Sequence, residues 1–391
     1  MAIRTAFKYR LYPNKQQEQT LLFYLRRCRD LYNAGLEQRR AFYQMRRAAL
    51  SCFAQINELP DLKQTYPAYQ DLPSHVLQDV LRRLDKAFAA FFRRIRNGET
   101  PGYPRFKRSG RYHSFTYPDV AGWKLQGDRL KLAGVGDVKL RLHREIQGTI
   151  KTVTIRHDID QWYVTFSCEA ETPTPLPTSE QAVGIDLGVM HFATLSTGET
   201  IESPRHYRKG LKRIKLLSQI KDRHKKGSRR RKRAAIALAR AHRKVRNQRA
   251  NFQHQLSRRL VNEYGLLAME DLSILNMTAT PEPKPDPEQE GQYLPNGAAA
   301  KAGLNQSIFD AGWGQFQQFC TYKAERAGRR VVLVDPKYTS QLCSSCGQIV
   351  KKDLSERWHS CACGCELDRD HNAAINILCR GQEVAHRLTG L

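Results

Sequence analysis

The sequence predicts a multidomain α+β protein, and three observations support that fold class. Residues 14–96 carry apolar side chains at helical spacing, whereas residues 110–172 alternate apolar and polar side chains, as strands do. A proline-containing linker at 173–182 precedes short apolar strands and long polar helical stretches. Five of the ten cysteines then fall within 23 residues, at 343–365. This cluster predicts a small metal-binding module.

The first half of the chain is predicted to be a helical bundle joined to an antiparallel sheet or small barrel. A strand over Arg4–Leu11 precedes Pro13, and Asn14 with Gln17 resembles a helix capping box. Strands at 138–142 and 162–168 show period-two alternation, and the first strand could join their sheet. Two helices with apolar stripes are expected between them, the stripes being Leu21, Leu25, Cys28, Tyr32 and Leu36, then Leu77, Leu81, Leu84, Phe88, Phe91 and Ile95.

The second half is predicted to be an α/β domain. Val183–Asp186 is expected to open a three-stranded meander, and a later buried strand over 266–269 ends at Glu270. Residues 278–303 are rich in proline and acids, so we expect a mobile loop there. The other expected elements are strands at 191–195, 199–202 and 331–334, helical structure over 204–263, a helix over 307–327 and a closing helix over 372–378.

Charge and composition restrict the class of protein. The 65 Lys and Arg residues exceed the 38 Asp and Glu residues by 27, which favours a polyanionic partner, nucleic acid before an anionic membrane. No apolar run reaches the roughly 18 residues of a membrane span, and the first residues lack a signal-peptide core. We therefore expect no membrane partner and a reducing, cytoplasmic location, in which clustered cysteines bind metal rather than form disulfides.

Three acids stand at the ends of predicted core elements. Asp186 and Glu270 end apolar strands, and Asp370 lies near the start of the closing helix. Each has a simpler interpretation, since Asp370 could cap its helix and Glu270 could merely end a strand. The order of meander, strand with Glu and helix with Asp nevertheless matches an RNase H-like nuclease core. Such carboxylates suit Mg²⁺, and two ions can activate water and stabilise the leaving oxygen of a phosphodiester.

The cysteine cluster predicts one structural zinc ion. Cys343 and Cys346 are one Cys-x₂-Cys pair, and after 14 residues come Cys361, Cys363 and Cys365. Four thiolates on two tight turns suit tetrahedral zinc and leave no open position for catalysis. The expected ligands are Cys343, Cys346, Cys361 and Cys363, with Cys365 as an alternative to either of the last two.

Two regions are candidate nucleic-acid surfaces. Between Arg208 and Arg249 there are 19 Lys or Arg residues and one acid, Asp222, a density that favours phosphate contact over a solvated charged face. The second region runs from Phe92 to Tyr112, and in it aromatic side chains are interleaved with basic ones. This pattern suits stacking on unpaired bases, although core packing explains any single aromatic equally well. The candidates are Tyr103, Arg105, Phe106 and Lys107, and Arg229, Arg230, Arg231, Lys232 and Arg233.

Several strings together resemble the TnpB family, the transposon-encoded RNA-guided nucleases related to type V CRISPR effectors. The resemblance spans essentially the whole chain, and its C-terminal strings are specific in combination. The strings are GIDLG at 184–188, MEDL at 269–272, CSSCG at 343–347 and LDRDHNAAINI at 367–377, with YRLYP at 9–13 and DAGW at 310–313.

The resemblance implies a RuvC-type triad of Asp186, Glu270 and Asp370, with Asp370 chosen over Asp368 because it lies two residues before Asn372. It also implies that the N-terminal domains hold a guide RNA and read a short DNA motif, with Gln78 as the main motif-reading candidate and Ser74 and Phe53 as weaker ones. The second cysteine group departs from the usual family spacing, since Ser360 stands where its first cysteine is expected.

The implied layout places a helical recognition domain (14–96) inside a wedge-like β-barrel domain (1–13 and 97–172). After the linker come a RuvC-like nuclease domain (183–337 and 366–391) and a zinc ribbon (338–365). The expected function is Mg²⁺-dependent, RNA-guided cleavage of double-stranded DNA by a mobile element's protein. The expected partners are a transposon-end guide RNA and target DNA, with a monomer favoured and a nucleoid-associated location in a prokaryote. The alternatives are a nuclease-inactive RNA-guided repressor and a DNA-joining transposase.

Overall fold

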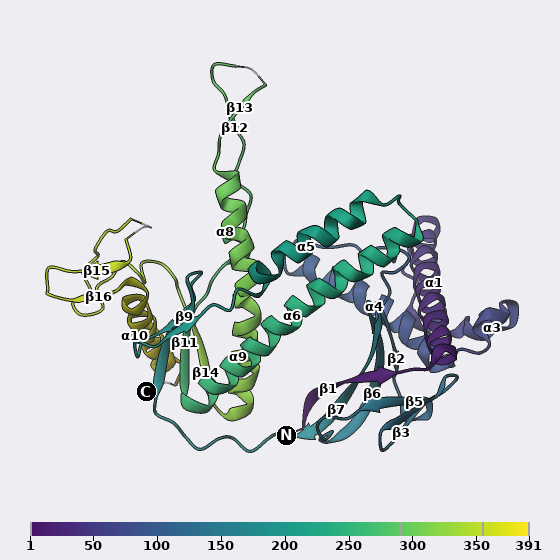
Figure 1. The fold of residues 1–391 in the computed structure, drawn as a ribbon. Coiled ribbons are helices and arrows are strands. Elements are labelled where there is room, and N and C mark those ends of the chain that lie inside the picture. The colour runs from purple at the N-terminus through teal and green to yellow at the C-terminus, as the bar shows by residue number, and fades with distance from the viewer. Residues whose placement is uncertain (1, 290, 354–355, 390–391) are drawn as a thin grey trace. The chain divides into compact units, whose positions relative to one another are not determined.

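The computed structural model describes residues 2–289, 291–353 and 356–389. Met1, Glu290, Leu354, Ser355, Gly390 and Leu391 belong to expected segments but lie outside the described residues. The chain divides into two compact units, Met1–Thr172 and Pro173–Leu391, which are described separately (Figure 1). No helix among the described residues is long and apolar enough to cross a membrane.

The first unit is built on an antiparallel sheet of seven strands in the order β2-β6-β7-β1-β5-β4-β3. The sheet is not a closed barrel, because among the described residues no strand pairing joins its edge strands β2 and β3. The elements are β1 (Ala2–Tyr12), α1 (Lys15–Arg46), α2 (Cys52–Asn57), α3 (Leu59–Thr65), η1 (Pro67–Tyr69), α4 (Ser74–Arg96), β2 (Ser114–Tyr117), η2 (Val120–Gly122), β3 (Trp123–Gln126), β4 (Arg129–Leu132), β5 (Gly136–Arg141), β6 (Thr149–Asp158) and β7 (Gln161–Glu171).

The expected local signals of this unit are confirmed. The Asn14 side chain accepts from Gln17 N while the Gln17 side chain accepts from Asn14 N, so the capping box starts α1. The first strand does join the sheet, and β1 pairs with β7 from Ala2↔Glu171 to Leu11↔Trp162. The apolar stripe of α1, and that of α4 from Leu77 to Phe88, share one hydrophobic core with the sheet. The stripe expected on α4 does not continue to the end of the helix, since Ile95 is 49 % exposed. The helices over 14–96 therefore pack on the strands.

The second unit contains a five-stranded mixed sheet in the order β10-β9-β8-β11-β14. Strands β8, β9 and β10 form the expected antiparallel meander, whereas β11 is parallel to both β8 and β14. The elements up to the hairpin are β8 (Ala182–Asp186), β9 (His191–Leu195), β10 (Thr200–Glu202), α5 (His206–Arg223), α6 (Arg229–Glu263), β11 (Leu266–Glu270), α7 (Ile274–Met277), β12 (Lys284–Pro285) and β13 (Tyr293–Leu294). They are followed by α8 (Ala298–Ala311), α9 (Trp313–Ala327), β14 (Arg330–Val334), β15 (Trp358–Ser360), β16 (Glu366–Asp368) and α10 (Arg369–Thr389).

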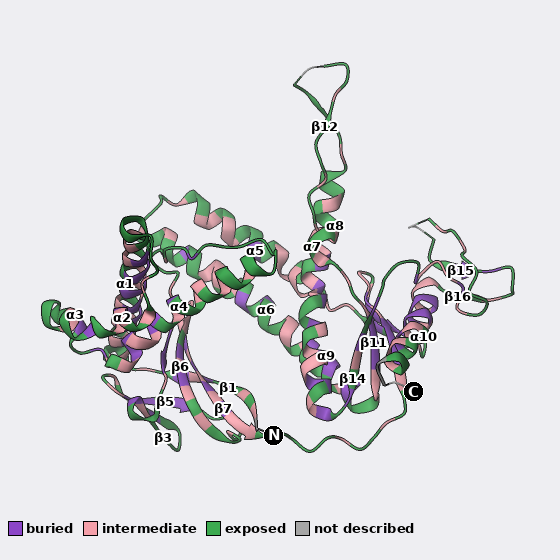
Figure 2. Ribbon diagram, turned by 180° about the vertical axis from the view of Figure 1, so that it is seen from behind, coloured by how far each residue is buried: buried purple, intermediate pink, exposed green. Residues whose placement is uncertain are grey.

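Helices cover both faces of this sheet, and the buried residues concentrate between the layers (Figure 2). Ile185 and Met269 point to a core that includes Leu260 of α6 and Phe316 of α9. The alternate residues Ala268 and Val332 pack with Ile377 of α10. This alternation follows from the period of two in a strand, and it places α10 alone against one face of the parallel strands.

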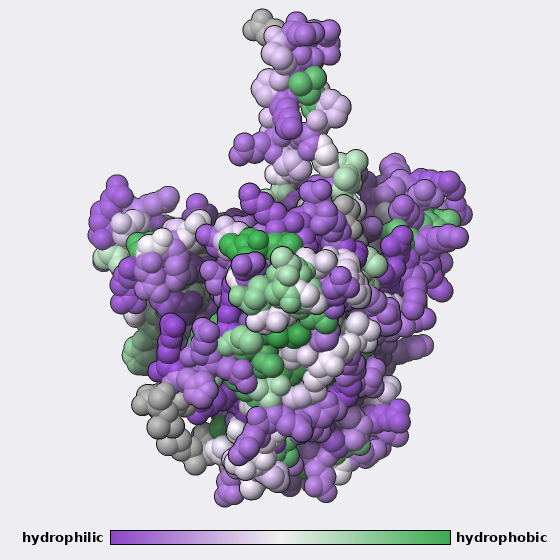
Figure 3. Space-filling view, turned by 90° about the vertical axis from the view of Figure 1, so that its left-hand side faces the viewer, coloured by the Kyte–Doolittle hydropathy of each residue, from purple (hydrophilic) through white to green (hydrophobic). Residues whose placement is uncertain are grey.

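Three expected elements differ from those observed. The helix expected over 307–327 is two helices, α8 and α9, because Gly312 adopts a left-handed conformation (φ +67°) that ends α8. The loop expected over 278–303 contains the short β12–β13 hairpin, and the alanines from Ala298 already belong to α8, since alanine is the best helix former. The closing helix is longer than 372–378, running over Arg369–Thr389. The hairpin projects with a largely hydrophilic surface (Figure 3).

Candidate functional site

The first two acids lie side by side at one edge of the five-stranded sheet. Asp186 is the last residue of β8, and Glu270 is the last residue of the neighbouring parallel strand β11. The preceding residues, Ile185 and Met269, are paired in register. Because parallel strands end at the same edge, the register itself brings the two carboxylates together.

Helix α10 brings the third acid to the same edge, and two glycines allow its close approach. A Cβ atom on Gly184 of β8 would lie 2.0 Å from the Ala374 carbonyl oxygen. A Cβ atom on Gly381 of α10 would lie 2.3 Å from Ala268 Cβ of β11. The helix therefore lies directly on the strand backbones. Asp370, one turn before Ala374, is held beside the ends of β8 and β11.

The structure separates the roles of the two neighbouring aspartates. The Asp368 carboxylate accepts hydrogen bonds from Asp370 N at 2.8 Å and His371 N at 3.3 Å, so Asp368 caps α10. The Asp370 carboxylate is not needed for capping. Its Oδ1 atom lies 3.8 Å from Arg357 Nη1, and one fifth of the side chain is exposed. Asp368 therefore has a capping role that Asp370 does not have.

All three carboxyl groups have raised pKa values. Burial is the main cause at Asp186, and the nearby charges of Glu270 and Asp370 raise its pKa further, well above the usual value. Burial also raises the pKa of Glu270, although the hydrogen bond from Thr339 and the charge of Arg380 both lower it. At Asp370, burial is the largest cause of the raised pKa, and the charge of Asp368 is the second. At Asp186, burial and the neighbouring carboxylates thus both disfavour the ionised form.

The sequence analysis missed the side chains that connect these acids to the segment before the first cysteine. The Thr339 hydroxyl donates to Glu270 Oε1 at 2.5 Å. On α10, Asn372 Nδ2 and Asn376 Nδ2 each donate to the Leu342 carbonyl at 2.7 Å, and Arg380 Nη1 donates to two carbonyls of the same segment. The spacing of 372, 376 and 380 marks one helix face. This four-residue spacing is the sequence signal that could have revealed Asn372, Asn376 and Arg380.

The four expected zinc ligands gather in the structure. Cys343 and Cys363 Sγ atoms are 3.6 Å apart, as are those of Cys346 and Cys361. Four thiolates about 2.3 Å from a tetrahedral zinc ion would be about 3.8 Å apart, so this group could hold zinc. The four Sγ atoms all lie within 4.8 Å of one another. Cys365 instead belongs to a second group with Cys343 and His359, whose ligand atoms also lie within 4.8 Å of one another. Among the described residues, the three carboxylates do not meet that 4.8 Å spacing.

The basic region between 208 and 249 forms a helical hairpin of α5 and α6. Arg229, Arg230, Lys232 and Arg233 are exposed on the first turns of α6. Arg231 differs, because its Nη1 atom donates to the Lys221 and His224 carbonyls at the end of α5. At the other end of α5, the Asp310 carboxylate accepts from Tyr207 N and Arg208 N. Arg231 therefore stabilises the hairpin, and its neighbours present the charge.

In the first unit, the aromatic and basic candidates lie at least partly exposed, with Tyr103 against α4 and both Phe106 and Lys107 against α1. Tyr103 packs edge-on against Phe88 and Phe91, and 46 % of its surface stays exposed. Phe106 is 44 % exposed, Arg105 is exposed, and the Lys107 backbone is fixed by two hydrogen bonds to the Asn33 side chain. The other candidates are Gln78, half-buried on α4, Ser74 at its first position, and Phe53, 72 % exposed on α2.

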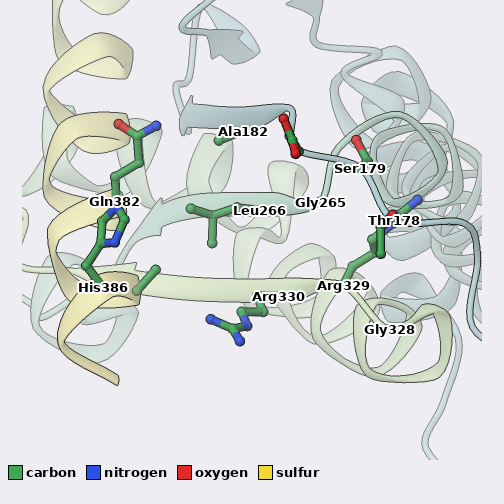
Figure 4. A pocket seen from close by; sticks show the side chains of 12 residues that line it. Thr178, Ser179, Ala182, Gly265, Leu266, Gly328, Arg329, Arg330, Gln382 and His386 are labelled. Atoms are coloured by element: carbon green, nitrogen blue, oxygen red, sulfur yellow. The ribbon is translucent and has the colours of Figure 1, made fainter. Parts of the chain in front are cut away.

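A cavity of 510 Å³ lies at the opposite edge of the sheet from the three acids, where β8, β11 and β14 begin. Its lining includes Ala182, Leu266, Arg330 and His386 (Figure 4). None of the acids, cysteines or basic residues singled out above lines it. The carboxylate site is therefore distinct from this cavity.

Comparison with known proteins gives matches along most of the chain. Residues 165–280 match a family described as "Probable transposase", and residues 313–377 match the "Cas12f1-like, TNB domain". Residues 1–48 match a family described as "Helix-turn-helix domain", although here β1 and the single long helix α1 fill this range. A solved Cas12f1–sgRNA–target DNA complex shares the fold, with a TM-score of 0.57 at 12 % identity, covering 96 % of this chain and 98 % of that one.

Two curated relatives align over almost the full length. A "Putative RNA-guided DNA endonuclease" of Streptomyces pristinaespiralis is 34 % identical, covering 97 % of this chain and 90 % of its own length. A protein with the same description from Escherichia coli (strain K12) is 30 % identical, covering 97 % and 92 %. Identity of this extent over nearly every described element shows that the chain belongs to the TnpB family.

Proposed function

We propose that this protein is an RNA-guided DNA endonuclease of a mobile element, which cuts target DNA beside a short motif. Hydrolysis would take place at a RuvC-like site of Asp186, Glu270 and Asp370. The observation that carries the proposal is the convergence of these acids at one sheet edge, where burial and mutual repulsion raise the pKa of Asp186. The proposal is also supported by the order of the meander, the parallel strands β11 and β14 and α10, which is the order expected of an RNase H-like domain.

The residues at this edge fit divalent magnesium. Carboxylate oxygens are the ligands that Mg²⁺ prefers, and the repulsion among the three groups is relieved when a cation binds. Two ions about 3.5–4 Å apart need carboxylate oxygens from several residues, and this edge offers three such groups. When bound, the pair would supply an activated water and stabilise the leaving oxygen.

The chain's own residues do the holding and orienting. Asp186 and Glu270 are fixed by the paired strands, and Asp370 is fixed by the capped first turn of α10. Thr339 fixes one oxygen of Glu270. This rigid arrangement favours a scissile phosphate held in one orientation, as proximity effects in catalysis require.

The nucleic-acid partners follow from charge and family. A guide RNA from the transposon end would supply sequence by base pairing, while the protein contacts backbones through the basic hairpin and the partly exposed aromatic residues of the first unit. Under this proposal the first unit contains the wedge-like and recognition domains, with Gln78, Ser74 and Phe53 reading the DNA motif. The second unit contains the nuclease domain and the zinc ribbon. The protein would act as a monomer at the nucleoid in the cytoplasm.

The test is a cleavage assay with full-length protein co-expressed with the RNA of its own element. A plasmid carrying the matching target is incubated with the complex in Mg²⁺ or in a chelator. We expect Mg²⁺-dependent cutting, which Asp186→Ala abolishes while RNA binding persists. Asp61→Asn, which changes an exposed acid of α3, is the matched control. Binding without cutting would support the repressor, and joined DNA products would support the transposase.

A further inference from the structure

We propose that Thr339 is a positioning residue for Glu270, holding one carboxylate oxygen so that the other faces the metal edge. The inference rests on the proposed function, since it assigns a role within that site. Thr339 lies in the segment between β14 and the first cysteine, outside every string that carries the family resemblance. Its role follows from its contacts.

The contact between the two side chains is short and buried. Thr339 is 3 % exposed, and its Oγ1 atom lies 2.5 Å from Glu270 Oε1 and 3.0 Å from the Pro336 carbonyl oxygen. An ionised carboxylate and a carbonyl are both acceptors, so the single hydroxyl proton goes to the nearer, charged oxygen. Bonds of this kind are short and about twice as strong as neutral ones. Among the described residues, no hydrogen bond is made to Glu270 Oε2, which leaves that oxygen for a ligand role.

The hydroxyl can orient Glu270 only because its own backbone is fixed. Asn376 Nδ2 of α10 donates to the Thr339 carbonyl at 2.9 Å. Arg380 Nη1, one turn further along, donates to the Asp335 and Lys337 carbonyls at 2.8 Å. The helix that carries Asp370 therefore also clamps the segment that carries Thr339. Helix α10 therefore helps to orient both acids: Asp370, which it carries, and Glu270 at the end of β11, through Thr339.

A residue that orients a metal ligand affects metal affinity more than it affects folding. Removing such an outer partner typically weakens metal binding by about 10–100-fold. Thr339→Val removes the hydroxyl and keeps the shape of the side chain, whereas Thr339→Ser keeps the hydroxyl. Thr321→Val is the matched control, because the Thr321 hydroxyl donates to Gln317 O of the same helix, α9.

The experiment measures Mn²⁺ binding to RNA-free, full-length protein by calorimetry, with Glu270→Gln as the background lacking the ligand charge. Mn²⁺ is the probe because it is bound by the same oxygen ligands as Mg²⁺. We expect Thr339→Val to raise the Mn²⁺ dissociation constant at least tenfold. Thr339→Ser and Thr321→Val should stay within about threefold of wild type, and Thr339→Val should have no further effect in the Glu270→Gln background. In the guide complex, Thr339→Val should raise the Mg²⁺ concentration for half-maximal cleavage more than it lowers the rate at saturating Mg²⁺.

A purely structural role predicts a different pattern, in which Thr339→Val lowers the melting temperature and leaves the Mn²⁺ affinity of the folded protein unchanged. That result, or an equal loss for Thr339→Ser, would overturn the inference alone. If Thr339→Val does not fold, the comparison of Thr339→Ser with Thr339→Ala decides, since only the alanine variant should lose Mn²⁺ affinity. A wild-type protein that binds no Mn²⁺ would instead overturn the proposed function, and this inference with it.

Discussion

The packing of α10 on β8 allows a quantitative prediction for Gly184→Ala. The new Cβ atom would lie 2.0 Å from Ala374 O and 2.7 Å from Leu378 N, whereas ordinary contact begins at 3.4 Å. Both atoms belong to the helix backbone, which cannot rotate away as a side chain can. Helix α10 must therefore move from the strand by about 1.4 Å. Asp370 is one turn from Ala374 and should move with it, away from Asp186.

This displacement should be visible in the rate of cleavage. A misplacement of about 1 Å can cost about 10²-fold in rate, and overpacking a core costs about 1–3 kcal/mol of stability. We therefore expect Gly184→Ala to slow single-turnover cleavage by the guide complex at least about 100-fold while RNA affinity is unchanged. Gly314→Ala is the matched control, because a Cβ atom there meets nothing within 4 Å. A folded Gly184→Ala protein that cuts at the wild-type rate would refute the reasoning.

Four further predictions follow from other parts of the second unit. Asp368→Asn should retain most cleavage activity, since Asn caps a helix as well as Asp, whereas Asp370→Asn should lose it; equal losses would contradict the assignment. Without divalent cations, the raised pKa of Asp186 means that the folded state binds its proton more tightly than the unfolded state, so stability should fall as pH rises above the ordinary carboxyl range. Asp186→Asn should accordingly raise the melting temperature at pH 7 in a chelator, and a decrease would show that the group is not destabilising. Metal analysis should find about one zinc per chain, reduced by Cys363→Ser and retained by Cys365→Ser, because only Cys363 belongs to the four-thiolate group. Replacing the four exposed basic residues within 229–233 by Gln should make the slope of log affinity for RNA against log salt less steep by about 3; an unchanged slope would remove this turn from the RNA surface.

The sequence predicted those features of the fold that depend on neighbours in the chain. The capping box at Asn14, the apolar stripe of α1, that of α4 as far as Phe88 and the alternation of β7 all depend on local spacing, and all are observed. The meander and the strand ending in Glu270 were equally accessible. The four cysteines could be chosen because zinc requires close thiolates on tight turns.

The remainder depends on contacts between distant residues. Gly312 ends α8 with a left-handed residue against Arg249 of α6, and no local pattern distinguishes this glycine from one inside a helix. Thr339 contacts Glu270 across 69 positions of sequence. Whether Asp368 or Asp370 caps α10 depends on side-chain direction, which spacing leaves open.

The pairing of β1 with β7 has a consequence for protein engineering. Ala2 lies opposite Glu171, so the strand that enters the first unit and the strand that leaves it are neighbours in the sheet. The two ends of the first unit therefore lie side by side in one sheet, and the second unit begins directly after them at Pro173. A chimera that grafts a relative's first unit onto this second unit at Pro173 would therefore test the proposed division of roles, in which the first unit reads the motif and the second unit cuts.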